Sequence, residues 1–328
     1  MSILVCGGAG YVGSHCLQEL KRQGVDCIVL DNLSRGHREA VGDTPLLVGD
    51  LGDEVFLEEV FSSHPIEGVM HFAASSQVGE SVQKPLDYYE NNLGCTIKLL
   101  QAMERHGVGS IVFSSSAAVY GEPEVTPIPE ESPCRPTNPY GETKLAMERL
   151  MHWCERAYGI RSVSLRYFNA AGADPEGFLG EDHNPETHLI PLVLQAALGV
   201  RDSVTIFGRD YPTPDGSCIR DYIHVQDLAQ AHLLALRRLL SGGESGIFNL
   251  GSQNGMSVCQ IIETAKQVTG VDFPVREGVR RAGDPAVLIA SSEKARRELG
   301  WSPVCSDPET ILSTAWRWHQ AHPHGYGR

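Results

Sequence analysis

The sequence predicts an α/β protein, a doubly wound, Rossmann-like parallel sheet joined to a smaller mixed α/β substrate-binding domain. Short apolar runs alternate with amphipathic helical patterns through the first half, which is typical of a parallel sheet covered on both faces. A glycine-rich turn directly follows the first apolar run. The length of 328 residues suits about two domains.

Six strands are predicted in the first half, at residues 3–6, 27–30, 46–48, 68–72, 111–114 and 162–166. Helices are predicted between them, at about 13–23, 53–64, 93–105 and 140–158. Right-handed crossovers favour the strand order 3-2-1-4-5-6. Ligand is then expected at the carboxyl ends of these strands.

The pattern changes after about residue 169, where Gly, Pro and Asp gather at 173–177. We therefore expect a cofactor domain at 1–172 and a substrate domain at 173–328, with the segment of about 219–250 packing back onto the first. Helices are predicted near 189–198, 293–299 and 308–319, a strand and a helix together at 222–240, and a further strand at 247–250. Ser257 and Gln260 form a capping box for a helix that Gly270 ends.

Composition and charge exclude several classes of protein. There are 41 acidic and 27 basic residues, a net charge of −14, which argues against nucleic-acid or anionic-membrane partners. Nine scattered cysteines without a C-x-x-C pair are typical of reduced thiols. No leader pattern and no run of 18 apolar residues is visible, so we expect a cytoplasmic protein.

The glycine-rich turn spans residues 7–13 and predicts a dinucleotide site. Gly7, Gly10 and Gly13 lack a Cβ where backbone must approach a pyrophosphate, and the following helix offers free N–H groups. Asp31 ends the second strand, 18 residues after Gly13. A carboxylate there accepts from a ribose 2′-hydroxyl and repels a 2′-phosphate, so NAD is predicted rather than NADP. A purely structural turn is the alternative.

Further cofactor contacts are predicted where later strands end. Asp50 can reach an adenine amino group or cap a helix, and Asn91, which is expected to start a helix, can bind or merely cap. The predicted cofactor residues are Gly7, Gly10, Tyr11, Val12, Gly13, Asp31, Asn32, Asp50, Leu51, Phe72, Ala73, Ala74, Asn91, Ser114, Tyr140, Lys144 and Tyr167.

Tyr140 and Lys144 form the predicted catalytic pair, on one face of a helix that Asn138 caps and Pro139 begins. A phenol that acts as a base near neutrality needs its pKa lowered by about three units, or about 4 kcal/mol. A cation roughly 4 Å away at an effective dielectric of about 20 supplies about that much. Lys144, helped by an oxidised nicotinamide, is predicted to do so. Such pairs are also common on solvated helix faces.

A serine-rich strand end at residues 113–121 completes the predicted catalytic set. The Ser116 hydroxyl, at the carboxyl edge of a central strand, can donate to or accept from a substrate hydroxyl, or it can simply cap the strand end. The chain resembles the extended short-chain dehydrogenase/reductase family in its glycine turn, its serine-rich strand end and its pair of Tyr140 and Lys144. The resemblance covers nearly the whole chain and includes residues 78–85, 166–169, 220–225 and 280–284.

The resemblance is closest to members that epimerise UDP-sugars, and it implies an isomerase of UDP-glucose and UDP-galactose. Tyr140 would take the proton of the 4′-hydroxyl, Ser116 would align that oxygen, and bound NAD would take the C4′ hydride and return it to the other face of a 4-keto sugar. No net redox change occurs, so the cofactor can stay bound. Members of the family are often homodimers, which we expect here too.

The resemblance also implies the substrate contacts, with arginines at the diphosphate and Asp284 at the ribose. These residues are Ser116, Tyr140, Phe168, Asn169, His188, Leu189, Thr205, Phe207, Arg220, Tyr222, Arg281 and Asp284. Several positions depart from the family pattern, among them Cys6, where threonine is often found. Ser76 stands where some members have lysine, and His188 stands where asparagine is more familiar. Leu288 lies where side-chain size governs acceptance of N-acetylhexosamines, so a UDP-N-acetylglucosamine 4-epimerase stays open.

Other functions are weighed by what their chemistry needs. A nucleotide-sugar 4,6-dehydratase requires an acid and a base directly after the strand-end serine, where this chain has Ala117 and Ala118. A non-catalytic NAD sensor would not need the serine, tyrosine and lysine together. No metal site is predicted, because the histidines at 319, 322 and 324 are interpreted as part of a solvated tail. His71 is expected to be a core histidine.

Overall fold

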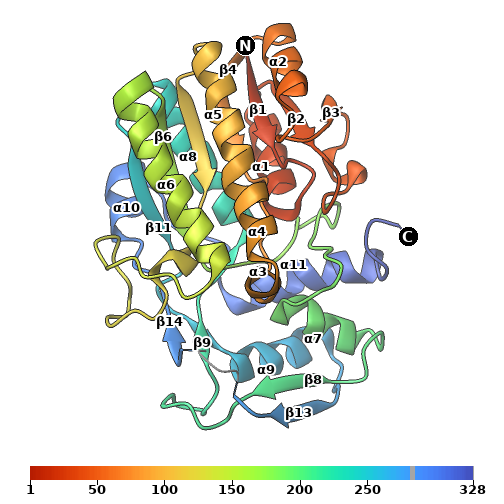
Figure 1. Ribbon diagram of the computed structural model, residues 1–328. Helices are drawn as coiled ribbons and strands as arrows, with labels where there is room; N and C mark the ends of the chain where they lie inside the picture. The colour runs from red at the N-terminus through yellow and green to blue at the C-terminus, as the bar shows by residue number, and fades with distance from the viewer. Residues whose placement is uncertain (281–284, 328) are drawn as a thin grey trace.

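The computed structural model describes residues 1–280 and 285–327. Figure 1 shows a large sheet flanked by helices and, below it, a smaller part that contains α7 (Leu189–Ala197), α9 (Val258–Thr269), β8 (Val204–Phe207) and β13 (Val275–Gly278). Helix α11 (Pro308–Ala321) packs on both α7 and α9. Within the described residues, no helix is long and apolar enough to cross a membrane.

Seven parallel strands make the large sheet, in the order β11-β6-β5-β4-β1-β2-β3. They are β1 (Ser2–Cys6), β2 (Cys27–Asp31), β3 (Leu46–Val48), β4 (Ile66–His71), β5 (Ser110–Ser114), β6 (Arg161–Tyr167) and β11 (Gly246–Leu250). The predicted order 3-2-1-4-5-6 is confirmed, and β11 extends it beyond β6. The strand order reverses between β1 and β4, and in this architecture ligands bind at the carboxyl ends of the strands beside such a reversal.

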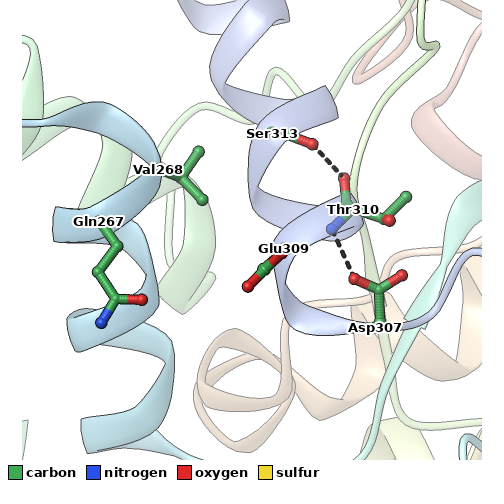
Figure 2. Close-up of a pocket in the computed structure, with 6 residues that line it drawn as sticks. All are labelled: Gln267, Val268, Asp307, Glu309, Thr310 and Ser313. Carbon is green, nitrogen blue, oxygen red and sulfur yellow. Dashed lines mark hydrogen bonds between the residues drawn. The ribbon is translucent and has the colours of Figure 1, made fainter.

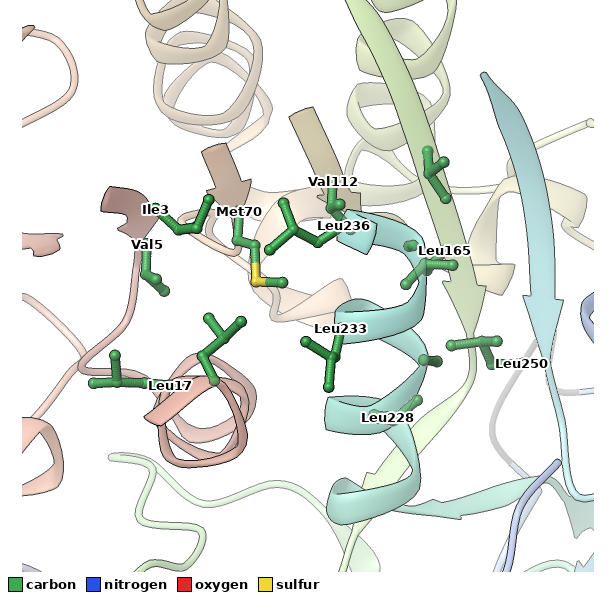
Figure 3. Packing of buried hydrophobic residues seen from close by; sticks show 14 of the residues in the cluster. Ile3, Val5, Leu17, Met70, Val112, Leu165, Leu228, Leu233, Leu236 and Leu250 are labelled. Carbon is green, nitrogen blue, oxygen red and sulfur yellow. The ribbon is translucent and has the colours of Figure 1, made fainter. Parts of the chain in front are cut away.

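Helices cover both faces of this sheet. They are α1 (Tyr11–Arg22) and α8 (Val225–Leu240) on one face, and α2 (Glu54–Ser63), α5 (Cys95–Arg105) and α6 (Pro139–Tyr158) on the other. Two hydrophobic cores result: the first lies between the sheet and helices α1 and α8, and the second between the sheet and helices α2, α5 and α6. Strand side chains alternate between faces, so Ile3 lies in the first core and Leu4 in the second. Figure 3 shows Leu236 of α8 beside Met70 in the first core.

The helical run before α5 begins earlier than predicted. It consists of α3 (Val78–Gln83), α4 (Pro85–Tyr88) and a π-helical segment, Tyr89–Gly94, that leads into α5. The helix predicted at about 93–105 corresponds to α5 (Cys95–Arg105), but the prediction that Asn91 starts a helix was wrong, because Asn91 lies inside the π-helical segment. The side chain of Asn92 is buried and bonds to Ser75 and Thr143. A polar residue in the core is invisible to a search for apolar periodicity.

The second half contains the predicted helices and several short strands that were not foreseen. The strand predicted near residue 222 is β10 (Tyr222–His224) and the helix predicted near 293–299 is α10 (Glu293–Leu299), whereas the unforeseen strands are β7 (Asn169–Ala171), β9 (Ile219–Arg220), β12 (Met256–Ser257) and β14 (Val287–Leu288). The capping box of Ser257 and Gln260 is confirmed, as is Gly270 at the end of α9, with φ of 70°. Strands of two or three residues are too short to show a periodicity.

The carboxyl-terminal segment is folded onto the protein, so the prediction of a solvated tail was wrong. His319 is buried in α11, and the His322 ring stacks on Trp318 at 3.7 Å between centroids. Tyr326 stacks on His37 at 4.8 Å, and its hydroxyl accepts from the Gly180 amide at 3.1 Å. Stacked aromatic rings hold this segment against the protein. The prediction had relied on its proline and glycine content, which does not show these ring contacts.

Four buried histidines are expected to make the folded protein less stable as the pH falls. Burial lowers the pKa of His71 to about 3, and those of His15, His224 and His232 to about 4. Each stays neutral in the folded state, whereas the unfolded chain binds the proton near pH 6.5. The unfolded state therefore binds more protons as pH falls from 6.5 to about 4, and each histidine lowers the free energy of unfolding by up to about 1.4 kcal/mol per pH unit.

Urea unfolding at a series of pH values between 7.5 and 4.5 measures this effect, and the midpoint should fall steeply below pH 6.5. The free energy of unfolding of His224→Gln should depend less steeply on pH, because up to one fewer proton is taken up when this variant unfolds. The exposed His152, replaced by Gln, serves as the control and should leave the profile unchanged. A stability that does not depend on pH across this range would contradict the prediction.

Candidate active site

The glycine turn joins β1 to α1 at the centre of the sheet's carboxyl edge. Gly7 has φ of +78°, and a Cβ there would lie 2.5 Å from the Ala73 amide nitrogen. A Cβ on Gly13 would lie 2.2 Å from the Gly7 carbonyl oxygen. The nearest atom to a Cβ on Gly10 would be 3.4 Å away, so the protein's own packing demands less of that position. Gly10 caps α1 without a side-chain bond, which leaves amides at the helix start for an anion.

Asp31, at the end of β2, is held beside this turn. One carboxylate oxygen accepts from the Ala9 amide at 3.0 Å and the other from the Leu33 amide at 2.8 Å. Burial raises its pKa. Each carboxylate oxygen has a further lone pair, so the side chain can still accept from ribose hydroxyls.

The other predicted cofactor residues line the same edge. Asp50 accepts from the Asn32 side chain at 2.7 Å and so connects the loops after β3 and β2. Leu51 packs in the second core, between the large sheet and helices α2, α5 and α6. The Phe72 amide bonds to the carbonyl of Cys6 at 2.8 Å.

A hydrogen-bonded loop continues this edge beyond Ala73 and Ala74. The Asn91 side chain donates to the Ser75 hydroxyl at 3.1 Å and so ties the loop to the helical run before α5. Tyr11 donates to the Gly172 carbonyl at 2.6 Å, which links the start of α1 to the second half of the chain. Val12 packs against the core of the first sheet face.

Tyr140, Lys144 and Ser116 are brought together where β5 ends and α6 begins. Asn138 caps α6 by accepting from the Gly141 amide at 2.9 Å. The Lys144 amine donates to the Ser114 carbonyl at 2.7 Å and lies 5.9 Å from the centre of the Tyr140 ring. Ser116 hydrogen-bonds to the Tyr140 phenol. The Ser114 hydroxyl bonds in turn to Tyr167 at 2.5 Å.

The electrostatics of this pair differ from the prediction. Burial raises the pKa of Tyr140, and only the bond from Ser116 opposes the rise. Burial also lowers the pKa of Lys144 to about 7, because desolvation disfavours its positive form. The prediction that Lys144 lowers the phenol pKa was incomplete, because it left out the desolvation of both groups. An oxidised nicotinamide, when bound, supplies a positive charge and a hydride acceptor.

The predicted substrate residues near the sheet lie on short strands that face its carboxyl edge. Asn169 begins β7 and donates to the Asp221 carbonyl at 3.1 Å, and Tyr222 begins β10, which pairs with β7. Arg220 lies on β9, where its guanidinium donates to the Pro285 carbonyl at 2.8 Å. Phe168 packs against a small core that also contacts Leu288.

The remaining predicted substrate residues lie farther into the second half. Thr205 and Phe207 are on β8, and Leu189 begins α7. His188 precedes α7, and its imidazole contacts the Glu181 carboxylate, which raises the histidine pKa to about 9. Arg281 and Asp284 lie outside the described residues.

The chain matches the model of the NAD dependent epimerase/dehydratase family over residues 3–251. The protein belongs to this family. The UDP-glucose 4-epimerase of Halalkalibacterium halodurans is 58% identical over 326 residues, which cover 99% of this chain and 98% of that protein. The UDP-glucose 4-epimerase of Lacticaseibacillus casei is 55% identical, with 100% of this chain and 99% of that protein covered.

Solved structures of similar proteins contain the expected cofactor. The UDP-glucose 4-epimerase of Bifidobacterium longum, in complex with NAD+ and UDP, is 38% identical and superposes with a TM-score of 0.93 over 99% of this chain and 100% of that one. The enzyme from Brucella ovis, in complex with NAD, is 47% identical with a TM-score of 0.94, over 96% of this chain and 97% of that one.

In this member of the family, a buried polar network that sequence reasoning missed supports the serine-rich end of β5. Arg166 on β6 and Glu148 on α6 form two hydrogen bonds, at 2.9 and 2.5 Å. Glu148 also accepts from Ser115 at 2.5 Å, and Arg166 donates to Tyr120 at 2.9 Å. The signal was present in the sequence, since Glu148 follows Lys144 by four positions and shares its helix face.

A surface depression between α9 and α11, with a volume of about 460 Å³, lies outside the predicted site (Figure 2). It is lined by Gln267, Val268, Asp307, Glu309, Thr310 and Ser313. Its polar groups have local roles, because Asp307 caps α11 by accepting from the Thr310 amide at 2.9 Å. We assign it no function in this family member.

Proposed function

We propose that the chain is an epimerase that interconverts UDP-glucose and UDP-galactose at C4′ through a transient 4-keto sugar and bound NAD. One observation carries the proposal. Tyr140, Ser116 and Lys144 converge at the carboxyl edge of the sheet, in a chain that is 58% identical over nearly its full length to a UDP-glucose 4-epimerase.

The proposed chemistry follows from the contacts of these three side chains. Tyr140, as the phenolate, takes the proton of the 4′-hydroxyl and becomes the phenol, and Ser116, which hydrogen-bonds to the Tyr140 oxygen, aligns the sugar oxygen. Lys144 is held by the Ser114 carbonyl, and the positive form of its amine stabilises the phenolate. NAD supplies the hydride acceptor and the hydride donor. Return of the hydride to the opposite face of C4′ gives the other epimer.

The second half of the chain is proposed to hold the nucleotide while the hexose turns. Residues 1–172 would form the NAD-binding domain, residues 173–328 the nucleotide-sugar-binding domain, and β11 supports the proposed return of segment 219–250 to the first domain. Asn169 and Arg220 are proposed to contact the nucleotide-sugar, with Arg220 at its diphosphate. An arginine fork suits a phosphate, and local positive charge can offset the acidic background.

The family name covers two reaction classes, and the serine strand favours epimerisation. Elimination of the 6-hydroxyl needs an acid and a base next to Ser116, but the residues there are Ala117 and Ala118. Ala117 is buried and begins a 3-10 turn, Ala117–Tyr120, so its methyl group packs in a small core. A methyl group cannot transfer a proton.

The test is a panel of UDP-sugars incubated with purified protein, without added cofactor or reductant. We expect NMR to identify UDP-glucose formed from UDP-galactose, and denaturation to release NAD. UDP-N-acetylglucosamine belongs in the panel because Leu288 packs against the same small core as Phe168, a predicted substrate contact. A 4-keto-6-deoxy product would show a dehydratase instead, and NADP in the native protein would overturn the cofactor assignment.

Homodimer formation and a cytoplasmic location are also proposed. Tyr89, Ile97 and Trp153, which are 41%, 39% and 61% exposed, lie on helical segments that pack on one another, and they offer apolar area to a second copy. Light scattering should give twice the 35.7 kDa chain mass, and a monomer would refute pairing. The nine cysteines are free thiols, as in a reducing compartment. A disulfide in protein purified without reductant would argue against that location.

A further inference from the structure

One group of metal-ligating side chains, among the residues that the structure describes, has no part in the proposed proton and hydride transfers, although one of them, His188, is also a predicted substrate contact. Glu181, His183, Glu186 and His188 each offer one ligand atom, and these four atoms lie within 4.8 Å of one another. All four come from a single loop of eight residues that leads into α7.

We propose that this loop binds one structural zinc ion through Glu181, His183, Glu186 and His188. The His183 Nδ1 atom lies 3.1 Å from the Glu181 Oε1 atom and 3.9 Å from the Glu186 Oε2 atom. The His188 Nδ1 atom contacts the same oxygen of Glu181. Zinc bonds of about 2.0–2.2 Å place tetrahedral ligands roughly 3.4 Å apart, so closure by about an ångström completes the shell.

The chemistry of the four donors fits zinc. Two carboxylates and two neutral imidazoles balance the charge of a divalent ion, and oxygen and imidazole nitrogen are both ligands that zinc accepts. Four protein ligands close a tetrahedral shell, which is the arrangement of a structural site rather than one with an open position. The alternative to a metal site is a proton-held cluster, in which hydrogen bonds between the histidines and the glutamates hold the same side chains together.

Two of the ligand side chains are buried and one is exposed, so the site has a rigid side and a side through which an ion can enter. The side chains of Glu181 and Glu186 are 5% and 7% exposed, whereas that of His188 is 54% exposed. The remaining oxygen of Glu186 accepts from the Thr187 and His188 amides at 2.7 and 2.8 Å, which aims its Oε2 atom at His183. Such second contacts orient metal ligands. An ion can enter past His188.

The site would fasten the loop between the two halves of the chain. The His183 ring meets the Tyr11 ring edge-on, with centroids 6.4 Å apart, and Tyr11 begins α1 beside the glycine turn. Asp182 accepts from the Tyr326 amide at 3.1 Å. On the other side, the loop runs directly into Leu189 at the start of α7. A bound zinc would hold these contacts in place, and its removal should lower the melting temperature.

The test measures metal content of untagged full-length protein after dialysis against micromolar zinc chloride. We expect one zinc per chain, and a loss of affinity of at least about tenfold in His183→Ala and in Glu181→Gln. His106→Ala is the matched control, because His106 also pairs with a glutamate, Glu58, at 2.8 Å, outside this loop. The control should keep one zinc per chain. Equal zinc in wild type and His183→Ala would overturn the proposal.

A cobalt titration of the metal-free wild type decides the matter even if a variant fails to fold. We expect cobalt binding to release protons and to give the intense visible absorption of a four-coordinate ion, and added zinc to abolish that absorption. Absence of such bands would assign the loop to the proton-held cluster and refute the metal site. The NAD content and epimerase activity report separately on the proposed function, so failure of one proposal does not mimic failure of the other.

Discussion

Replacing Tyr140 with phenylalanine is expected to lower kcat for UDP-galactose epimerisation by about 10²- to 10⁴-fold, the usual contribution of a positioned acid–base group. The change removes only the hydroxyl that bonds to Ser116 and keeps the ring that packs beside Lys144. The glycine turn and Asp31 are untouched, so bound NAD should stay at the wild-type level.

The measurement combines steady-state turnover with the NAD released on denaturation. Tyr158→Phe is a matched control at the far end of the same helix, where the side chain is 62% exposed, and it should keep full activity. Undiminished turnover in Tyr140→Phe would refute its assignment as the base. Loss of NAD together with turnover would instead assign Tyr140 a role in holding the cofactor.

Arg166→Leu is expected to lower the free energy of unfolding by about 3–5 kcal/mol, because it leaves a carboxylate buried without its partner. The side chains of Arg166 and Glu148 are only 4% and 3% exposed. Their bonds reach Ser115, next to the proposed catalytic serine, so the variant should also disturb the end of β5.

Urea unfolding monitored by circular dichroism gives this free energy. Arg156→Leu, on the exposed side of α6, is the control and should change stability by no more than about 0.5 kcal/mol. The double variant Glu148→Leu with Arg166→Leu should recover much of the loss, since replacing both partners removes the buried charge. A single variant as stable as the control would contradict this account of the network.

Local patterns in the sequence were enough to determine the sheet and the position of the proposed chemistry. Apolar alternation and right-handed crossovers led to the strand order, because both depend on neighbouring residues and chain handedness. The spacing of Tyr140 and Lys144 placed them on one helix face. Gly7 and Gly13 were found by their motif, and the structure supplies the reason, since a Cβ at either would collide with backbone.

Only the tertiary structure decided which polar groups are buried together. Glu148 meets Arg166, and Trp318 stacks on His322 beside Tyr326, through contacts that periodicity does not encode. The electrostatics of Tyr140 likewise depend on desolvation by the whole fold. Partners for buried charges come from distant or irregular segments, so their identity is fixed only when the chain is folded.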